Sequence, residues 1–148
     1  MLGVFLALFA VGLDRLFPPP DPRALPVSAT VSDRNGALLR AFTVPGGQWR
    51  LPVRIADIAP LFIDMTVAYE DRRFRYHPGI DPVALARAAY QLVTNGRIVS
   101  GGSTLSMQLA RLLEPREDRS IAAKLRQMAR AVQLERRYSK DEILAWYL

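Results

Sequence analysis

The sequence contains no cysteine and only one histidine, His77. The lack of cysteine excludes disulfides, thiolate zinc sites and cysteine nucleophiles. A single histidine excludes a metal site built from several histidines and leaves little room for a Ser-His-Asp triad. Lysine is also scarce, since only Lys124 and Lys140 occur, so the formal net charge of +6 comes almost entirely from arginine. A basic surface of this kind suits an anionic partner such as a phosphate, a nucleic acid or an anionic lipid.

The composition is otherwise that of one globular domain. The chain has 148 residues, of which 50% are hydrophobic and 23% are charged, and this balance allows a packed core. Nucleic-acid binding fits poorly, because no aromatic residue is interleaved with the basic run of residues 111–126 and no known reader motif occurs.

The N-terminus begins with thirteen residues that carry no charge. A membrane span needs about 20 apolar residues, so the run alone is too short. It ends in Asp14, Arg15 and three prolines, as a membrane exit would. We interpret residues 1–17 as part of a hydrophobic signal-anchor, the alternative being a buried N-terminal helix. Residues 18–26 are interpreted as a stiff, extended proline-rich linker, and residues 27–148 as one domain.

The domain is predicted to be mainly α-helical and to begin with a small β-hairpin. Asn35-Gly36, between two weakly alternating runs, predicts a hairpin within residues 27–42. Pro60 and the pair Asp81-Pro82 predict helices over residues 60–69 and 81–94. Further helices are expected over residues 103–113, capped by Ser103, and over residues 120–137. Ser139 and Glu142 form a capping box that opens a last helix, which has no C-cap signal, so we expect the domain to be incomplete there.

The sequence Glu70-Asp71-Arg-Arg-Phe-Arg ends an otherwise apolar helix with two acidic residues. Carboxylates at a helix C-terminus face the unfavourable end of the helix dipole, so we expect Arg72, Arg73 and Arg75 to offset them. A carboxylate held there is suited to general acid–base chemistry. The alternative is a surface cluster of ion pairs, and His77 by itself is more typical of a structural hydrogen bond.

Two further features could bind an anion. Ser100-Gly101-Gly102-Ser103-Thr104 precedes a helix, and a glycine-rich turn at a helix N-terminus offers free N–H groups; the alternative is an ordinary loop with a good N-cap. The second feature lies in the helix predicted over residues 120–137. Its buried stripe is predicted to consist of Ile121, Leu125, Met128 and Val132. Lys124 lies at the edge of that stripe and is expected to point inward. Three arginines are expected on the solvated or lipid-facing side: Arg126, Arg130 and Arg137.

Taken in order, these motifs resemble the peptidoglycan glycosyltransferases, the lysozyme-like domain of bifunctional penicillin-binding proteins. AYEDRRFRYHPGID (residues 68–81) resembles the first motif of that family and GGSTLSMQLAR (residues 101–111) the second. KLRQMARAVQLERRYSKDEILAWYL (residues 124–148) resembles the third and the start of the fourth. The Met107-Gln108 pair and the segment from Lys124 to Gln127 are most similar to the penicillin-binding protein 1C branch.

The resemblance implies a role for each matching residue. Glu70 is the expected catalytic base, which deprotonates the 4-hydroxyl of lipid II. The positions that contact the donor phosphates or support the site are Ser103, Gln108, Arg111, Arg119 and Lys124. The motif positions expected to be structural are Asp71, Phe74, His77, Gly79, Gly101, Gly102 and Thr104. Gln127 stands where many members carry a second glutamate, so a second-site role there is in doubt, and Met107 and Arg111 replace a usual glutamine and lysine.

The resemblance also implies the surroundings of the reaction. The expected partners are lipid II, the undecaprenyl-linked glycan strand, the membrane and other cell-wall synthesis proteins, with no nucleic acid. A divalent ion, Mg²⁺ or Mn²⁺, is expected to bind mainly through the substrate pyrophosphate, with no organic cofactor and with no metal ligands assigned. The expected location is the periplasmic side of the bacterial inner membrane. Two alternatives stay open: a non-catalytic, truncated module that binds lipid, and a lysozyme-like enzyme that cleaves peptidoglycan.

Overall fold

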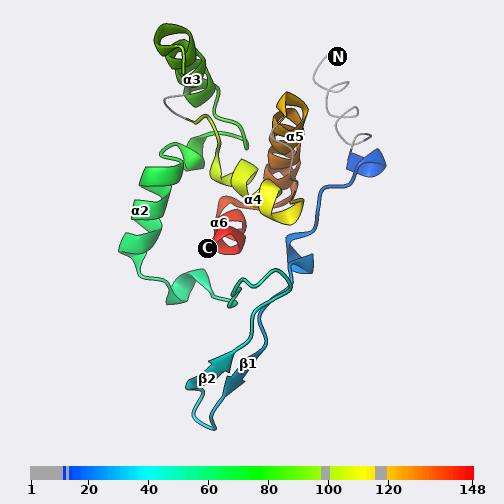
Figure 1. Ribbon diagram of the computed structural model, residues 1–148, viewed down its shortest axis with the longest axis vertical. Coiled ribbons are helices and arrows are strands. Elements are labelled where there is room, and N and C mark those ends of the chain that lie inside the picture. The colour runs from blue at the N-terminus through cyan, green and yellow to red at the C-terminus, as the bar shows by residue number, and fades with distance from the viewer. Residues whose placement is uncertain (1–11, 13, 98–100, 116–119) are drawn as a thin grey trace.

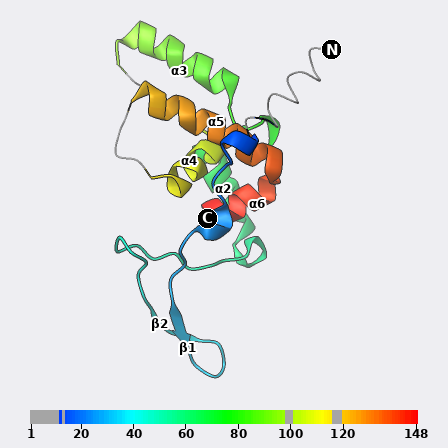
Figure 2. The same ribbon diagram turned by 90° about the vertical axis from the view of Figure 1, so that its right-hand side faces the viewer.

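The computed structural model describes residues 12, 14–97, 101–115 and 120–148. The hairpin consists of β1 (Thr30–Ser32) and β2 (Leu38–Ala41), which pair in antiparallel fashion with an irregularity between Val31 and Ser32. Gly36 has a φ of +84°, a backbone conformation that favours glycine, so the predicted Asn-Gly turn is confirmed. In both views the hairpin projects away from the helices (Figures 1 and 2). Short 3-10 helices cover Pro22–Ala24, Ile55–Asp57 and Phe74–Tyr76.

The next two helices begin and end where local signals place them. Helix α2 (Pro60–Glu70) starts at its proline. Helix α3 (Pro82–Asn95) is capped by Asp81, whose side chain accepts hydrogen bonds from two backbone N–H groups, and it ends at Gly96 with a φ of +64°. Figure 1 shows α2 and α3 along one side of the molecule, next to the remaining helices. These predictions hold because caps and proline act through neighbouring residues alone.

The core lies where α4 (Leu105–Leu113), α5 (Ile121–Arg137) and α6 (Lys140–Tyr147) meet. Fully or almost fully buried side chains come from all three helices and from the segment after α2: Phe74, Leu105, Leu109, Ala110, Leu134, Ile143 and Leu144. The predicted capping box of α6 is present in full, with Ser139 and Glu142 bonded to each other's backbone. Helix α4 therefore forms the central element on which α5 and α6 pack.

Two predictions about these helices are wrong. The N-cap of α4 is Thr104, whose hydroxyl accepts from the Met107 N–H, because the Ser103 hydroxyl accepts from Lys124 instead. The predicted apolar stripe of α5 is wrong for its first half: Ile121 and Leu125 are exposed, at 81% and 59%, whereas Met128 and Val132 are half-buried. The buried positions are Ala123, Ala131, Gln133 and Leu134. The two alanines among them let α5 approach its neighbours closely.

The segment that enters the domain, residues 14–18, is hydrogen-bonded to α5. Arg130 donates to the backbone carbonyls of Phe17 and Pro18, both at 3.0 Å. Gln133 donates to the Asp14 side chain at 2.8 Å, and Arg136 forms an ion pair with Asp14 at 3.0 Å. The expectation that Arg130 lies on a solvated face is therefore wrong: its side chain is only 18% exposed and also pairs with Glu114.

The observed architecture is thus mainly α-helical with a two-stranded hairpin. The predicted anchor falls mostly on residues 1–11 and 13, which lie outside the described residues. Within the described part of the chain, no helix combines the length and apolar character needed to cross a bilayer.

Candidate active site

Glu70 is the last residue of α2 and is half-buried. Its Oε2 accepts a hydrogen bond from the side-chain amide of Gln108 at 2.9 Å. Gln108 lies on α4, so this bond joins the end of one helix to the middle of another. The amide N–H gives the carboxylate a partner that carries no charge of its own.

Asp71 is buried beside Glu70 and fixes the turn that follows. Its carboxylate accepts from His77 Nε2 at 3.0 Å and from the backbone N–H of Leu105, the first residue of α4, also at 3.0 Å. The Gly79 N–H donates to His77 Nδ1 at 3.2 Å, so the ring proton of His77 is on Nε2. The negative charge of Asp71 thus sits at the favourable N-terminal end of α4, and it connects α2 to the glycine loop.

Two of the three arginines expected to offset the acidic pair have other partners. Arg73 pairs with Asp81, with its Nε 2.9 Å from the carboxylate, and Arg75 pairs with Asp141 at 2.5 Å. Arg72 lines the cleft described below. The prediction is therefore wrong for Arg73 and Arg75. The two carboxylates are stabilised instead by hydrogen bonds from Gln108 and His77 and by the N-terminus of α4.

The glycines of both motifs allow close packing. Gly79 has a φ of +95°, and a Cβ there would lie 2.7 Å from the Ala131 backbone of α5. A Cβ on Gly102 would lie 2.7 Å from the Leu85 side chain of α3. Thr104 links the two motifs, since its hydroxyl donates to the Gly79 carbonyl at 2.6 Å. Phe74 is fully buried under the Lys140 ammonium, which lies 4.4 Å from the ring centre.

The cationic side chain of Lys124 lies next to the N-terminus of α4. The Lys124 ammonium donates to the Ser103 hydroxyl. Burial, and then the positive charge of Arg111, hold the pKa of Lys124 below its usual 10.5. Lys124 therefore points inward as predicted, and Arg111 lies within electrostatic reach of it. Two cations within electrostatic reach of each other are typical of an anion-binding site.

A cleft of about 560 Å³ joins the carboxylate to the glycine loop. Its wall includes Glu70, Arg72 and Arg87, together with Gly101, Ser103 and Thr104. The structure thus brings most of the predicted site residues to one region. Arg87 is a cleft residue that the sequence analysis missed, because nothing in the pattern of α3 marks it.

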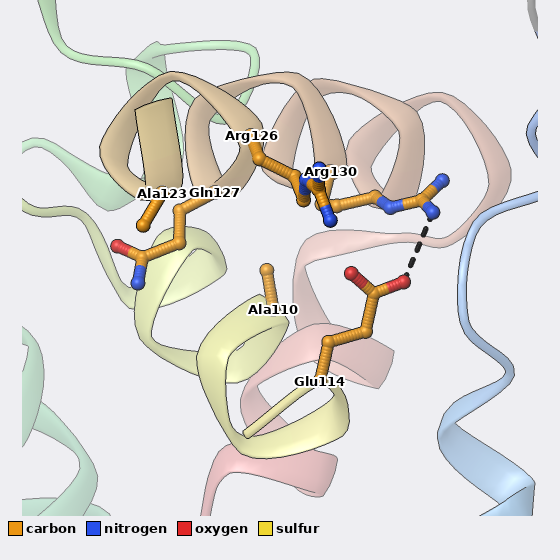
Figure 3. A pocket seen from close by; sticks show the side chains of 6 residues that line it. All are labelled: Ala110, Glu114, Ala123, Arg126, Gln127 and Arg130. Atoms are coloured by element: carbon orange, nitrogen blue, oxygen red, sulfur yellow. Dashed lines mark ion pairs between the residues drawn. The ribbon is translucent and has the colours of Figure 1, made fainter. Parts of the chain in front are cut away.

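One predicted position, Gln127, lies away from this cleft. Gln127 lines a pocket of about 10 Å³ between α4 and α5, which has room for about one water molecule. Figure 3 shows its amide beside Ala123, while Arg130 pairs with Glu114 on the other side of that pocket. Arg119 lies outside the described residues. Among the residues that are described, no group of three or more His, Cys, Asp or Glu side chains gathers to hold a metal ion.

Tyr147, at the end of α6, was also missed as a site residue. Its hydroxyl donates to the Gln108 Oε1 at 3.3 Å. Burial, followed by the charge of Glu70, raises the pKa of Tyr147 above its usual 10, with Arg111 acting in the opposite direction. No local signal in the sequence marks Tyr147 as a site residue, because nothing near it shows that α6 folds back onto α4.

Comparison with known proteins gives consistent matches. Residues 35–148 match the Transglycosylase family. The chain is 46% identical to penicillin-binding protein 1C of Escherichia coli strain K12, with 97% of this chain and 18% of that protein aligned. It is 39% identical to penicillin-binding protein 1A of Aquifex aeolicus strain VF5, over 100% of this chain and 21% of that protein. The chain spans about a fifth of these relatives, and the match over most of its length places it in the transglycosylase family of the penicillin-binding proteins.

Proposed function

We propose that the chain is the peptidoglycan glycosyltransferase part of a penicillin-binding protein and polymerises lipid II into glycan strands. The observation that carries this proposal is the shared cleft of Glu70 and Ser103, with Lys124 bonded to Ser103. One carboxylate next to a cationic turn matches what the transfer of a sugar from a pyrophosphate requires. The mainly helical build supports a lysozyme-like domain.

The proposed step is a single displacement. Glu70 takes the proton from the 4-hydroxyl of the acceptor, and that oxygen forms a bond to C1 of the growing chain. The bond from C1 to the pyrophosphate oxygen breaks, undecaprenyl pyrophosphate leaves with the bonding electrons, and the configuration at C1 inverts. Gln108 occupies Oε2 of Glu70, so we assign Oε1 to the incoming proton. Lys124 and Arg111 stabilise the charge that develops on the leaving group.

A divalent ion remains part of the proposal. As the family resemblance implies, Mg²⁺ or Mn²⁺ would be held mainly by the substrate pyrophosphate and would add positive charge there. We also propose that the domain lies at the outer face of the inner membrane, with residues 1–17 as anchor, because its proposed substrate is linked to a membrane lipid. Other cell-wall synthesis proteins are proposed as partners.

The test is lipid II polymerisation in detergent with a divalent ion, using the protein in the full length that its host makes. Removal of a general base lowers the rate about 10²- to 10⁴-fold, so Glu70→Gln should form almost no glycan. Asp64→Asn, an exposed acid-to-amide change on α2, is the matched control and should polymerise like the wild type. Equal rates for Glu70→Gln and the wild type would overturn the role of Glu70.

The same experiment separates the two alternative functions. A wild-type protein that binds lipid II without turnover would be a lipid-binding module. Release of fragments from finished peptidoglycan, without polymer from lipid II, would indicate a lysozyme-like hydrolase. Either result would overturn the proposed polymerisation.

A further inference from the structure

A chain of two hydrogen bonds ends at the Glu70 carboxylate. The Tyr147 hydroxyl of α6 donates to Oε1 of Gln108, and Nε2 of Gln108 on α4 donates to Oε2 of Glu70 on α2, at 3.3 and 2.9 Å. Three helices that are distant in sequence therefore meet at one side-chain amide. The direction of donation is the same in both bonds and leads toward the carboxylate.

The direction matters because a glutamine amide has a donor end and an acceptor end. If the amide of Gln108 rotated by half a turn, its oxygen would face the Glu70 carboxylate, and two acceptors would repel each other. A hydroxyl that donates to Oε1 opposes that rotation. It also polarises the amide, which strengthens the hydrogen bond that the amide N–H donates to the carboxylate. Tyr147 keeps its proton under ordinary conditions, since burial and the charge of Glu70 raise the pKa of its hydroxyl.

The position of Tyr147 is fixed by the packing of α6. The capping box of Ser139 and Glu142 fixes the start of α6, and the fully buried Ile143 and Leu144 fix its face against α4. The Tyr147 ring packs against the same core cluster. The position of the hydroxyl is thus set by helix packing.

We propose that Tyr147 is a positioning residue, which acts through Gln108 to hold the Glu70 carboxylate in the orientation that accepts the proton of the attacking hydroxyl. The inference rests on the proposed function and extends it to a residue outside the cleft wall. Tyr147 touches neither substrate nor reacting atoms in this scheme. Its effect should therefore show in kcat more than in KM, because substrate binding does not use it.

The test compares Tyr147→Phe with Tyr138→Phe in the polymerisation assay. Tyr138 belongs to the same core region, where its ring packs edge-on to Trp146 at 4.6 Å, so its variant also loses one hydroxyl there. A neutral hydrogen bond contributes about 0.5–1.5 kcal/mol, which corresponds to a loss of roughly two- to thirteenfold in kcat for Tyr147→Phe. The KM should stay within about twofold of the wild type, and Tyr138→Phe should match the wild type in both constants.

A double-mutant cycle separates positioning from general support of the fold. If Tyr147 acts through Gln108, then Gln108→Ala and the double variant with Tyr147→Phe should have the same kcat. Losses that multiply in the double variant, or a kcat of Tyr147→Phe equal to that of the wild type, would overturn the inference. A wild type without polymerase activity would instead overturn the proposed function, so the two failures are distinguishable.

Discussion

The contact between Gly79 and α5 gives a prediction that can be calculated from the structure. Gly79 has a φ of +95°, and an added Cβ would lie 2.7 Å from the carbonyl carbon and oxygen of Ala131 and 2.9 Å from the Val132 nitrogen. All three atoms belong to the backbone of a helix, so none can rotate away. Gly79→Ala must therefore strain its own backbone and also push the turn away from α5.

Gly96 provides a matched control for the backbone term. It also has a positive φ, of +64°, but a Cβ there would meet no atom within 4 Å. Gly96→Ala should cost only the left-handed conformation, about 1–2 kcal/mol. Gly79→Ala should add an overpacking cost of about 1–3 kcal/mol to a similar backbone cost. This is a large part of the total stability of a domain, which is about 5–15 kcal/mol.

The assay is thermal and urea unfolding followed by circular dichroism. For a chain of this size, the extra 1–3 kcal/mol should lower the Tm of Gly79→Ala by about 3–10 °C relative to Gly96→Ala. Equal Tm values for the two variants would refute the reasoning, because they would show that the turn and α5 do not approach as closely as the structure has them. The comparison does not depend on any catalytic activity.

Two further predictions concern charged groups of the site. Asp71→Asn replaces a buried acceptor of two donors, from His77 and Leu105, so urea unfolding should show a loss of about 2–3 kcal/mol, and a loss below about 0.5 kcal/mol would contradict this role. Burial and Arg111 lower the pKa of Lys124, so Lys124 loses its charge at a lower pH than an ordinary lysine. The polymerisation rate should accordingly decline on the alkaline side below pH 10.5, and Lys124→Arg should move that decline to higher pH; identical alkaline profiles would exclude Lys124 as its source.

The structural features that the sequence predicted correctly are those that depend only on neighbouring residues. Asp81-Pro82, the capping box of Ser139 and the Asn35-Gly36 turn each specify a helix start or a reversal through neighbouring residues. The grouping of Glu70 with the glycine loop also followed from motif order. These features needed no knowledge of which helices pack together.

The errors arise where packing partners decide. The periodicity of α5 favoured Ile121 and Leu125 as buried, but the neighbouring helices lie on the face that carries Ala123, Ala131 and Leu134. The adjacent hydroxyls of Ser103 and Thr104 could each cap α4, and only the position of Lys124 on α5 separates their roles. Tyr147 becomes a site residue only because α6 folds back onto α4.

The bonds between the entering segment and α5 have a mechanical consequence. A pull on the chain ahead of Asp14 is resisted first by Arg136 and Gln133, and at Phe17 and Pro18 by Arg130. The force therefore passes into α5, whose other end carries Lys124 and its bond to Ser103. While these bonds hold, the hairpin that follows in the chain bears none of it. The connection between Asp14 and the domain is then as stiff as the helix to which it is bonded, and the proline stretch would bear the force only after the bonds to α5 break.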